Sequence, residues 1–89
     1  TLENAVPNPF NPSTQIRFGL AEAGPVRVDV LDPRGRVVAT LAEGRHAAGE
    51  HTLMWNGRDA NGASVSSGVY FVKARAAGQV QTRKITLLK

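Results

Sequence analysis

The sequence has 89 residues, a formal net charge of +4, 42% hydrophobic and 20% charged residues. A chain of this length buries about 60–65% of its unfolded surface and forms one domain, not two. The absence of cysteine excludes disulfides, thiolate metal sites and cysteine nucleophiles. The basic residues are scattered singly, without a recognition helix or interleaved aromatics, which argues against nucleic-acid binding. No apolar run approaches the roughly 20 residues that span a bilayer. We therefore expect a domain that is not membrane-inserted and that is a piece of a longer protein.

Residues 1–14 form a proline-rich lead-in to residues 15–89, which we expect to form a single β-sandwich domain. Three of the five prolines lie in Pro7-Asn8-Pro9-Phe10-Asn11-Pro12. Each proline fixes its own φ and drives the preceding residue toward extended geometry. Phe10 supplies the large apolar side chain of this motif, so we expect Phe10 to pin the lead-in onto the sandwich.

Apolar residues that recur with a period of two predict β-strands in most of the remaining chain. The predicted strands are residues 15–20, 26–30, 36–41, 51–55, 68–76 and 80–88. Turn residues recur about every 8–12 residues, and no window of about ten residues has a helical period. The sequence therefore predicts an all-β fold, an antiparallel β-sandwich of six to seven strands.

Three segments between these strands predict turns or loops. Asp32-Pro33-Arg34-Gly35 has the residues that a type I turn favours and predicts a hairpin. Residues 43–50 contain two glycines and no apolar period, which predicts a loop. Trp55 is the largest candidate for the core, and residues 56–62 that follow it are turn-forming almost throughout.

Two groups of residues invite a metal-site interpretation, and neither has the required spacing. His46 and His51 have no evident third ligand on a rigid element. Residues 59–62 look like half of a calcium loop. With Gly62 at the sixth position of such a loop, the first ligand position falls on Gly57 and the twelfth on Gly68, so a tight Asx turn is the better interpretation. We expect no metal and no cofactor.

No arrangement of catalytic residues is evident either. No serine lies in a Gly-x-Ser-x-Gly motif with a placed His and Asp, and no glycine-rich phosphate loop occurs. In Asn11-Pro12-Ser13, proline occupies the excluded position of the glycosylation motif. We therefore expect that the protein is not an enzyme.

Four sequence blocks carry a resemblance to a known family. Together they resemble the type IX secretion C-terminal sorting domain, known as the Por secretion sorting domain. That family is related in sequence to the Ig-like domain of the flagellar hook-capping protein. The resemblance implies an Ig-like or fibronectin III-like sandwich. The blocks are residues 7–14 with Ile16 and Phe18, residues 28–41, residues 49–57, and residues 67–71 with residues 84–89.

The resemblance implies a non-catalytic signal that directs a cargo protein through the outer membrane. Its partners would be the type IX translocon, the sorting peptidase that removes the domain, and the cargo domain of the same chain. The protein would pass through the periplasm to the cell surface or the medium. The terminal strand could be recognised by β-augmentation or by charge. The residues expected to carry recognition are Gly68, Tyr70, Lys84, Ile85, Leu87, Leu88 and Lys89.

Other interpretations remain open at this point. Ile85 and Leu87 are equally expected as core residues, and Gly68 as a backbone hinge. The alternative function is that of an Ig-like structural or assembly module in a flagellar hook cap or a surface adhesin. Pro-Asn-Pro-Phe and the final Lys-Ile-Thr-Leu-Leu-Lys favour sorting. A carbohydrate-binding module would need an exposed aromatic platform, and one Trp, one Tyr and three Phe are mostly needed in the core.

Overall fold

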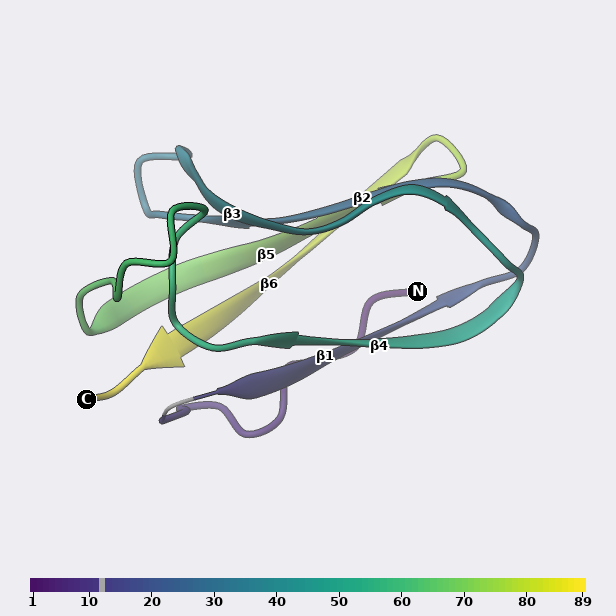
Figure 1. Cartoon of the computed structure of the whole chain (residues 1–89). Coiled ribbons are helices and arrows are strands. Elements are labelled where there is room, and N and C mark those ends of the chain that lie inside the picture. The colour runs from purple at the N-terminus through teal and green to yellow at the C-terminus, as the bar shows by residue number, and fades with distance from the viewer. Residues whose placement is uncertain (12) are drawn as a thin grey trace.

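The computed structural model describes residues 1–11 and 13–89, which form a sandwich of two sheets (Figure 1). Pro12 of the lead-in motif lies outside the described residues. The smaller sheet pairs β1 (Thr14–Leu20) with β4 (Gly49–Trp55), and the four-stranded sheet has the order β3-β2-β5-β6. Its strands are β2 (Gly24–Leu31), β3 (Val37–His46), β5 (Gly68–Ala76) and β6 (Gln79–Leu87).

All strand pairs are antiparallel, which confirms the predicted all-β sandwich. The strand limits follow the predicted ones to within about two residues, except at the end of β3. Within residues 1–11 and 13–89 there is no helix of the length and apolarity that crosses a membrane.

One hydrophobic core fills the space between the two sheets. The alternation in β2 turns its valines inward, and β1 and β5 contribute their own alternate residues from either side. Trp55 is 2% exposed, and the centroid of its ring lies 5.5 Å from that of the Phe10 ring and 5.2 Å from that of the Tyr70 ring. Trp55 is therefore the largest core side chain, as predicted. The other large core residues are Ile16, Phe18, Val26, Val28, Val30, Val72, Ile85 and Leu87.

The turn between β2 and β3 is fixed by Asp32. The N–H of Gly35 donates to the Asp32 carbonyl at 2.9 Å, which closes the predicted β-turn. The N–H groups of Arg34 and Arg36 donate to Asp32 Oδ1 at 2.9 and 3.0 Å. Gly35 has φ +87°, a conformation that glycine adopts without steric cost. The residue types at this turn thus determine its geometry.

The Asp32→Asn variant should lose less stability in acid than the wild type. Hydrogen bonds from the Arg36 and Arg34 N–H groups lower the pKa of the Asp32 carboxyl below its ordinary 3.8. A lowered pKa gives stability that is complete above the ordinary value and is lost as the pH falls through the folded-state value. An Asn oxygen accepts the same bonds without titrating. Urea midpoints between about pH 2 and 6 test this, and parallel curves for the two proteins would contradict it.

The prediction of a loop over residues 43–50 is wrong. β3 continues to His46 and β4 begins at Gly49, so only residues 47 and 48 connect them. Arg27 of β2 pairs with Glu43 in the ladder, and their side chains form an ion pair of 2.8 Å. Residues 43–45 are exposed, and the position opposite the buried Val26 of β2 is Gly44, which has no side chain to bury. A strand whose inward position is a glycine has no apolar period to reveal it.

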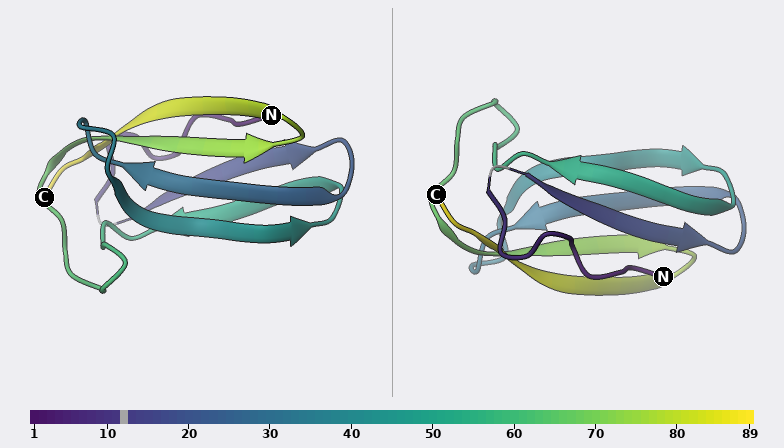
Figure 2. Two further views of the ribbon diagram at one scale, coloured as in Figure 1. Left: turned by 90° about the horizontal axis from the view of Figure 1, so that it is seen from above. Right: turned by 90° about the horizontal axis from the view of Figure 1, so that it is seen from below.

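The lead-in lies along the seam between β1 and β6, on one side of the sandwich (Figure 2, right). Toward β1, Val6 and Gln15 exchange backbone hydrogen bonds of 3.0 and 2.8 Å. Toward β6, the Phe10 N–H donates to the Thr86 carbonyl, and the Leu88 N–H donates to the Phe10 carbonyl, both at 3.0 Å. The lead-in therefore connects the two sheets.

The lead-in also contributes side chains to the core. Phe10 is buried against Trp55, which confirms that it pins the segment. Leu2 and Ala5 are buried as well, although they lie outside the proline motif. Residues 1–11 are thus part of the packed structure.

Candidate functional site

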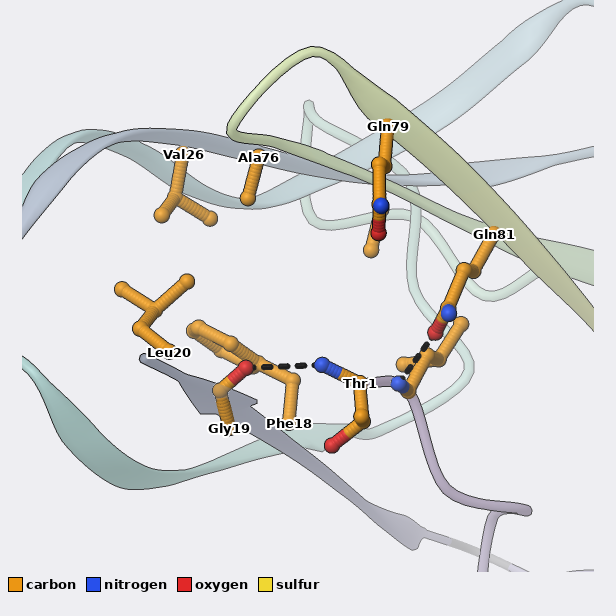
Figure 3. A pocket seen from close by; sticks show the side chains of 10 residues that line it. Thr1, Phe18, Gly19, Leu20, Val26, Ala76, Gln79 and Gln81 are labelled. Atoms are coloured by element: carbon orange, nitrogen blue, oxygen red, sulfur yellow. Dashed lines mark hydrogen bonds between the residues drawn. The ribbon is translucent and has the colours of Figure 1, made fainter. Parts of the chain in front are cut away.

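A hollow between the sheets near Thr1 is too small for a ligand (Figure 3). Its volume is about 40 Å³, whereas ligand pockets usually measure about 300–1,000 Å³. The Thr1 ammonium donates to the Gly19 carbonyl at 2.7 Å, and the Leu2 N–H donates to the Gln81 side chain. A space of this size accommodates water, and these hydrogen bonds hold the start of the lead-in in place.

An open hollow of about 440 Å³ lies between the Asp32 turn and a second aspartate turn. Asp59 Oδ1 accepts the N–H groups of Asn61 and Ala63 at 2.9 and 3.0 Å, the pattern seen at Asp32. Residues 59–62 therefore form the tight Asx turn that the sequence predicts. Among the described residues no cluster of three or more His, Asp or Glu side chains is placed to hold a metal ion.

The two histidines pack around Phe18 where β3 meets β4. The His51 ring stacks on Phe18 with centroids 5.1 Å apart, and the His46 ring meets the His51 ring edge-on at 5.3 Å. His51 Nε2 lies 2.7 Å from the Ala47 carbonyl, and His46 Nδ1 lies 3.1 Å from the Gly44 carbonyl. Both side chains thus hydrogen-bond to nearby backbone.

The residues predicted for recognition meet at one end of the β5–β6 pair. Gly68 lies opposite Leu87 and Tyr70 lies opposite Ile85, so the fold brings the two predicted segments side by side. Tyr70, Ile85 and Leu87 are buried in the core. Gly68 has φ +150°, which requires glycine for a backbone reason. These four positions have structural roles.

The other three predicted residues, Lys84, Leu88 and Lys89, are exposed. Lys89 Nζ donates to the Ser64 hydroxyl at 2.7 Å, and the Lys89 N–H donates to the Ser67 hydroxyl at 3.1 Å. A partner can therefore contact this group without unfolding the domain.

Tyr70 occupies a tyrosine corner, an arrangement common in Ig-like sandwiches. Its hydroxyl donates to the Ser66 carbonyl four residues earlier at 2.7 Å, and its ring packs edge-on against Trp55. Burial raises the pKa of the Tyr70 hydroxyl, and the charge of Asp32 adds to this. Tyr70 therefore remains protonated and fastens the start of β5.

Tyr70→Phe should lower the free energy of unfolding by about 0.5–1.5 kcal/mol, because it removes one hydrogen bond and leaves the ring in place. Urea denaturation of both proteins measures the difference. If Tyr70 instead serves recognition, the variant will unfold like the wild type and lose partner binding.

The edge of β6 that β-augmentation would use is already occupied between Lys84 and Leu88. The Asn8 amide mimics a peptide group: its Nδ2 donates to the Lys84 carbonyl at 3.0 Å, and its Oδ1 accepts the Thr86 N–H at 2.9 Å. Phe10 continues the pairing toward Leu88. A partner that used these backbone groups would first have to displace the lead-in.

The outer face of the four-stranded sheet carries a row of residues that the recognition prediction did not include. The strand register aligns Val37, Leu31, Phe71 and Lys84 across β3, β2, β5 and β6. Leu31 and Phe71 are half-buried, and Val37 is 53% exposed. The signal was present in the sequence, because an apolar residue next to the inward Tyr70 must face outward in a strand.

Some charged residues on this outer face form ion pairs with other described residues, and some do not. Arg27 forms ion pairs with both acids of the face, Asp29 at 2.9 Å and Glu43 at 2.8 Å. Thr40 also donates to Asp29 at 2.8 Å. Three further cations on the same face form no ion pair within residues 1–11 and 13–89: Lys73, Arg75 and Lys84.

Comparison with known proteins gives a consistent family likeness. The family model described as the FlgD Ig-like domain matches residues 5–79. The basal-body rod modification protein FlgD of Salmonella typhimurium is 39% identical over 54 residues. This match covers 61% of the chain and 23% of the length of that relative.

Two solved structures have a similar fold. FlgD from Xanthomonas campestris, described in relation to hook capping in flagellar assembly, aligns at a TM-score of 0.65 with 29% identity. The alignment covers 96% of this chain and 64% of that one. PorZ, a surface component of the type IX secretion system of Porphyromonas gingivalis, aligns at a TM-score of 0.68 with 23% identity. It covers 96% of this chain and 11% of PorZ, and it indicates a shared fold alone.

Proposed function

The chain belongs to the FlgD Ig-like domain family, and from this premise we propose that it is a non-catalytic structural module of an exported assembly. The observation that carries the proposal is the family match over residues 5–79. Flagellar hook capping, named for the Xanthomonas protein, is the kind of assembly role that it suggests.

The use of the polar side chains supports a structural role. Asp32 and Asp59 each accept hydrogen bonds within their own turn, and both histidines contact local backbone. The side chains best suited to acid–base chemistry thus stabilise the fold.

Domain replacement in the full-length protein tests this function. This domain is replaced by an unrelated Ig-like domain of similar size, which should not affect export but should not support assembly. We expect the replaced protein to be produced and exported and its assembly to be lost, as seen by electron microscopy of cells. Normal assembly after replacement would overturn the proposal.

A second candidate function is that of a type IX sorting signal, and the observation that favours it is the position and exposure of the C-terminal motif. The Lys-Ile-Thr-Leu-Leu-Lys motif, residues 84–89, lies beyond the family match and comprises the end of β6 (Gln79–Leu87) and the two residues after it. Its residues Lys84, Leu88 and Lys89 are exposed. The domain would then be recognised by the translocon and removed by the sorting peptidase after export of the cargo.

A reporter fused ahead of residues 1–89 in a type IX-competent bacterium tests the second candidate. The intact domain should carry the reporter to the surface or medium. The Lys84→Ala, Lys89→Ala double variant should reduce export while remaining folded, because exposed substitutions usually cost within about 0.5 kcal/mol. If the variant is folded and is exported normally, Lys84 and Lys89 are not part of the sorting signal. Retention of the intact fusion in the periplasm would contradict the proposal that the domain is a sorting signal.

A further inference from the structure

We propose that the outer face of the four-stranded sheet is a protein-docking surface for a partner with an apolar centre and an acidic rim. The inference rests on the assembly role proposed above and identifies the face that would carry it. Phe71 is the central anchor, and Lys73, Arg75 and Lys84 are the cations that select the partner's charge.

The apolar part of this face is continuous. Val37, Leu31 and Phe71 are direct neighbours across three strands, and neighbouring strands lie about 4.8 Å apart. The partly exposed Val69 extends the row along β5. A half-buried aromatic among aliphatic neighbours is held in a fixed position, so it loses little conformational entropy on binding and suits a hot spot.

The charges around this row specify an acidic partner. Arg27 and the two acids it contacts carry one net negative charge, and the three cations that form no ion pair among the described residues outweigh it, so the face is net positive. Arg75 lies across β5–β6 from Val80, and Lys84 lies beside Phe71. Carboxylates on the partner would find these cations at the rim, where complementary charge directs association.

A protein fits this face better than a nucleic acid. Single-stranded nucleic acids bind to several aromatic side chains that stack on successive bases. Here Phe71 is the aromatic residue of the row, and its neighbours Val37 and Leu31 are aliphatic. An apolar centre with a charged rim is the usual anatomy of a protein–protein interface.

Site-specific photo-crosslinking in the full-length protein tests the surface. Benzoylphenylalanine is placed at position 71, and at position 54 as a matched control, because Met54 is 61% exposed on the other sheet. We expect position 71 to cross-link in cells to a protein segment rich in Asp and Glu, and position 54 to give no such product. Circular dichroism confirms that both variants are folded.

Charge reversal then tests the rim. Arg75→Glu with Lys84→Glu should reduce the position-71 cross-link about tenfold or more, whereas Arg17→Glu on β1 should leave it unchanged.

Equal products from positions 71 and 54, an unchanged yield after reversal, or capture of nucleic acid or lipid at position 71 would overturn the proposal. If domain replacement abolishes assembly but the charge-reversed variant assembles normally, the proposed docking surface is wrong and the proposed structural role is retained. If replacement has no effect, the module proposal fails as well.

Discussion

Trp55→Ala is expected to lower the free energy of unfolding by about 3–5 kcal/mol, the range for removing a large buried aromatic. The Trp55 ring joins Phe10 of the lead-in to Tyr70 of β5, so one side chain connects three separate segments. Its Nε1–H donates to the Arg58 carbonyl at 2.9 Å, and this acceptor would lose its partner. A domain of this size is stable by about 4–13 kcal/mol, so the loss is a large fraction of the total.

Chemical denaturation of the two proteins measures this loss. Met54→Ala is the matched control, because Met54 precedes Trp55 on the same strand and is 61% exposed. The control should change stability by less than about 0.5 kcal/mol. If the two substitutions had equal, small effects, Trp55 would not be the centre of the core, and a ligand-platform role for it would need to be reconsidered.

Features governed by local sequence were predictable. Alternation in β1, β2 and β5 identifies the inward residues, because each strand has one buried face. Asp32 and Asp59 specify their turns through hydrogen bonds within five residues. Such features depend on neighbours along the chain, and so the residue types alone indicate them.

Features that depend on distant partners were not predictable in the same way. The end of β3 is a strand because β2 lies beside it, and its own side chains are exposed. Asn8 acts as a peptide mimic because Lys84 and Thr86, which follow it by 76 and 78 residues in the sequence, lie within reach. The candidate site was located only partly for the same reason. The sequence indicated the exposed Lys84, whereas the alignment of Phe71 with Leu31 and Val37 requires the strand register.

Removal of residues 1–11 should leave a chain without a cooperative unfolding transition. Leu2, Ala5 and Phe10 are buried, and the loss of Phe10 alone should cost about 3–5 kcal/mol. The truncation also removes the backbone hydrogen bonds that join the lead-in to β1 and β6. The combined loss is comparable to the whole stability of a domain of this size, about 4–13 kcal/mol.

Two single substitutions separate the causes of this effect. Phe10→Ala keeps the backbone bonds and should remain folded with reduced stability, whereas Val6→Ala, at a side chain that is 67% exposed, should unfold like the wild type. Thermal and urea unfolding followed by circular dichroism distinguish the three proteins. If the truncated chain unfolds cooperatively at the wild-type midpoint, the lead-in is a dispensable linker. If it does not, any test of export or assembly must keep residues 1–11, because a fusion that begins at β1 would fail through unfolding and say nothing about recognition.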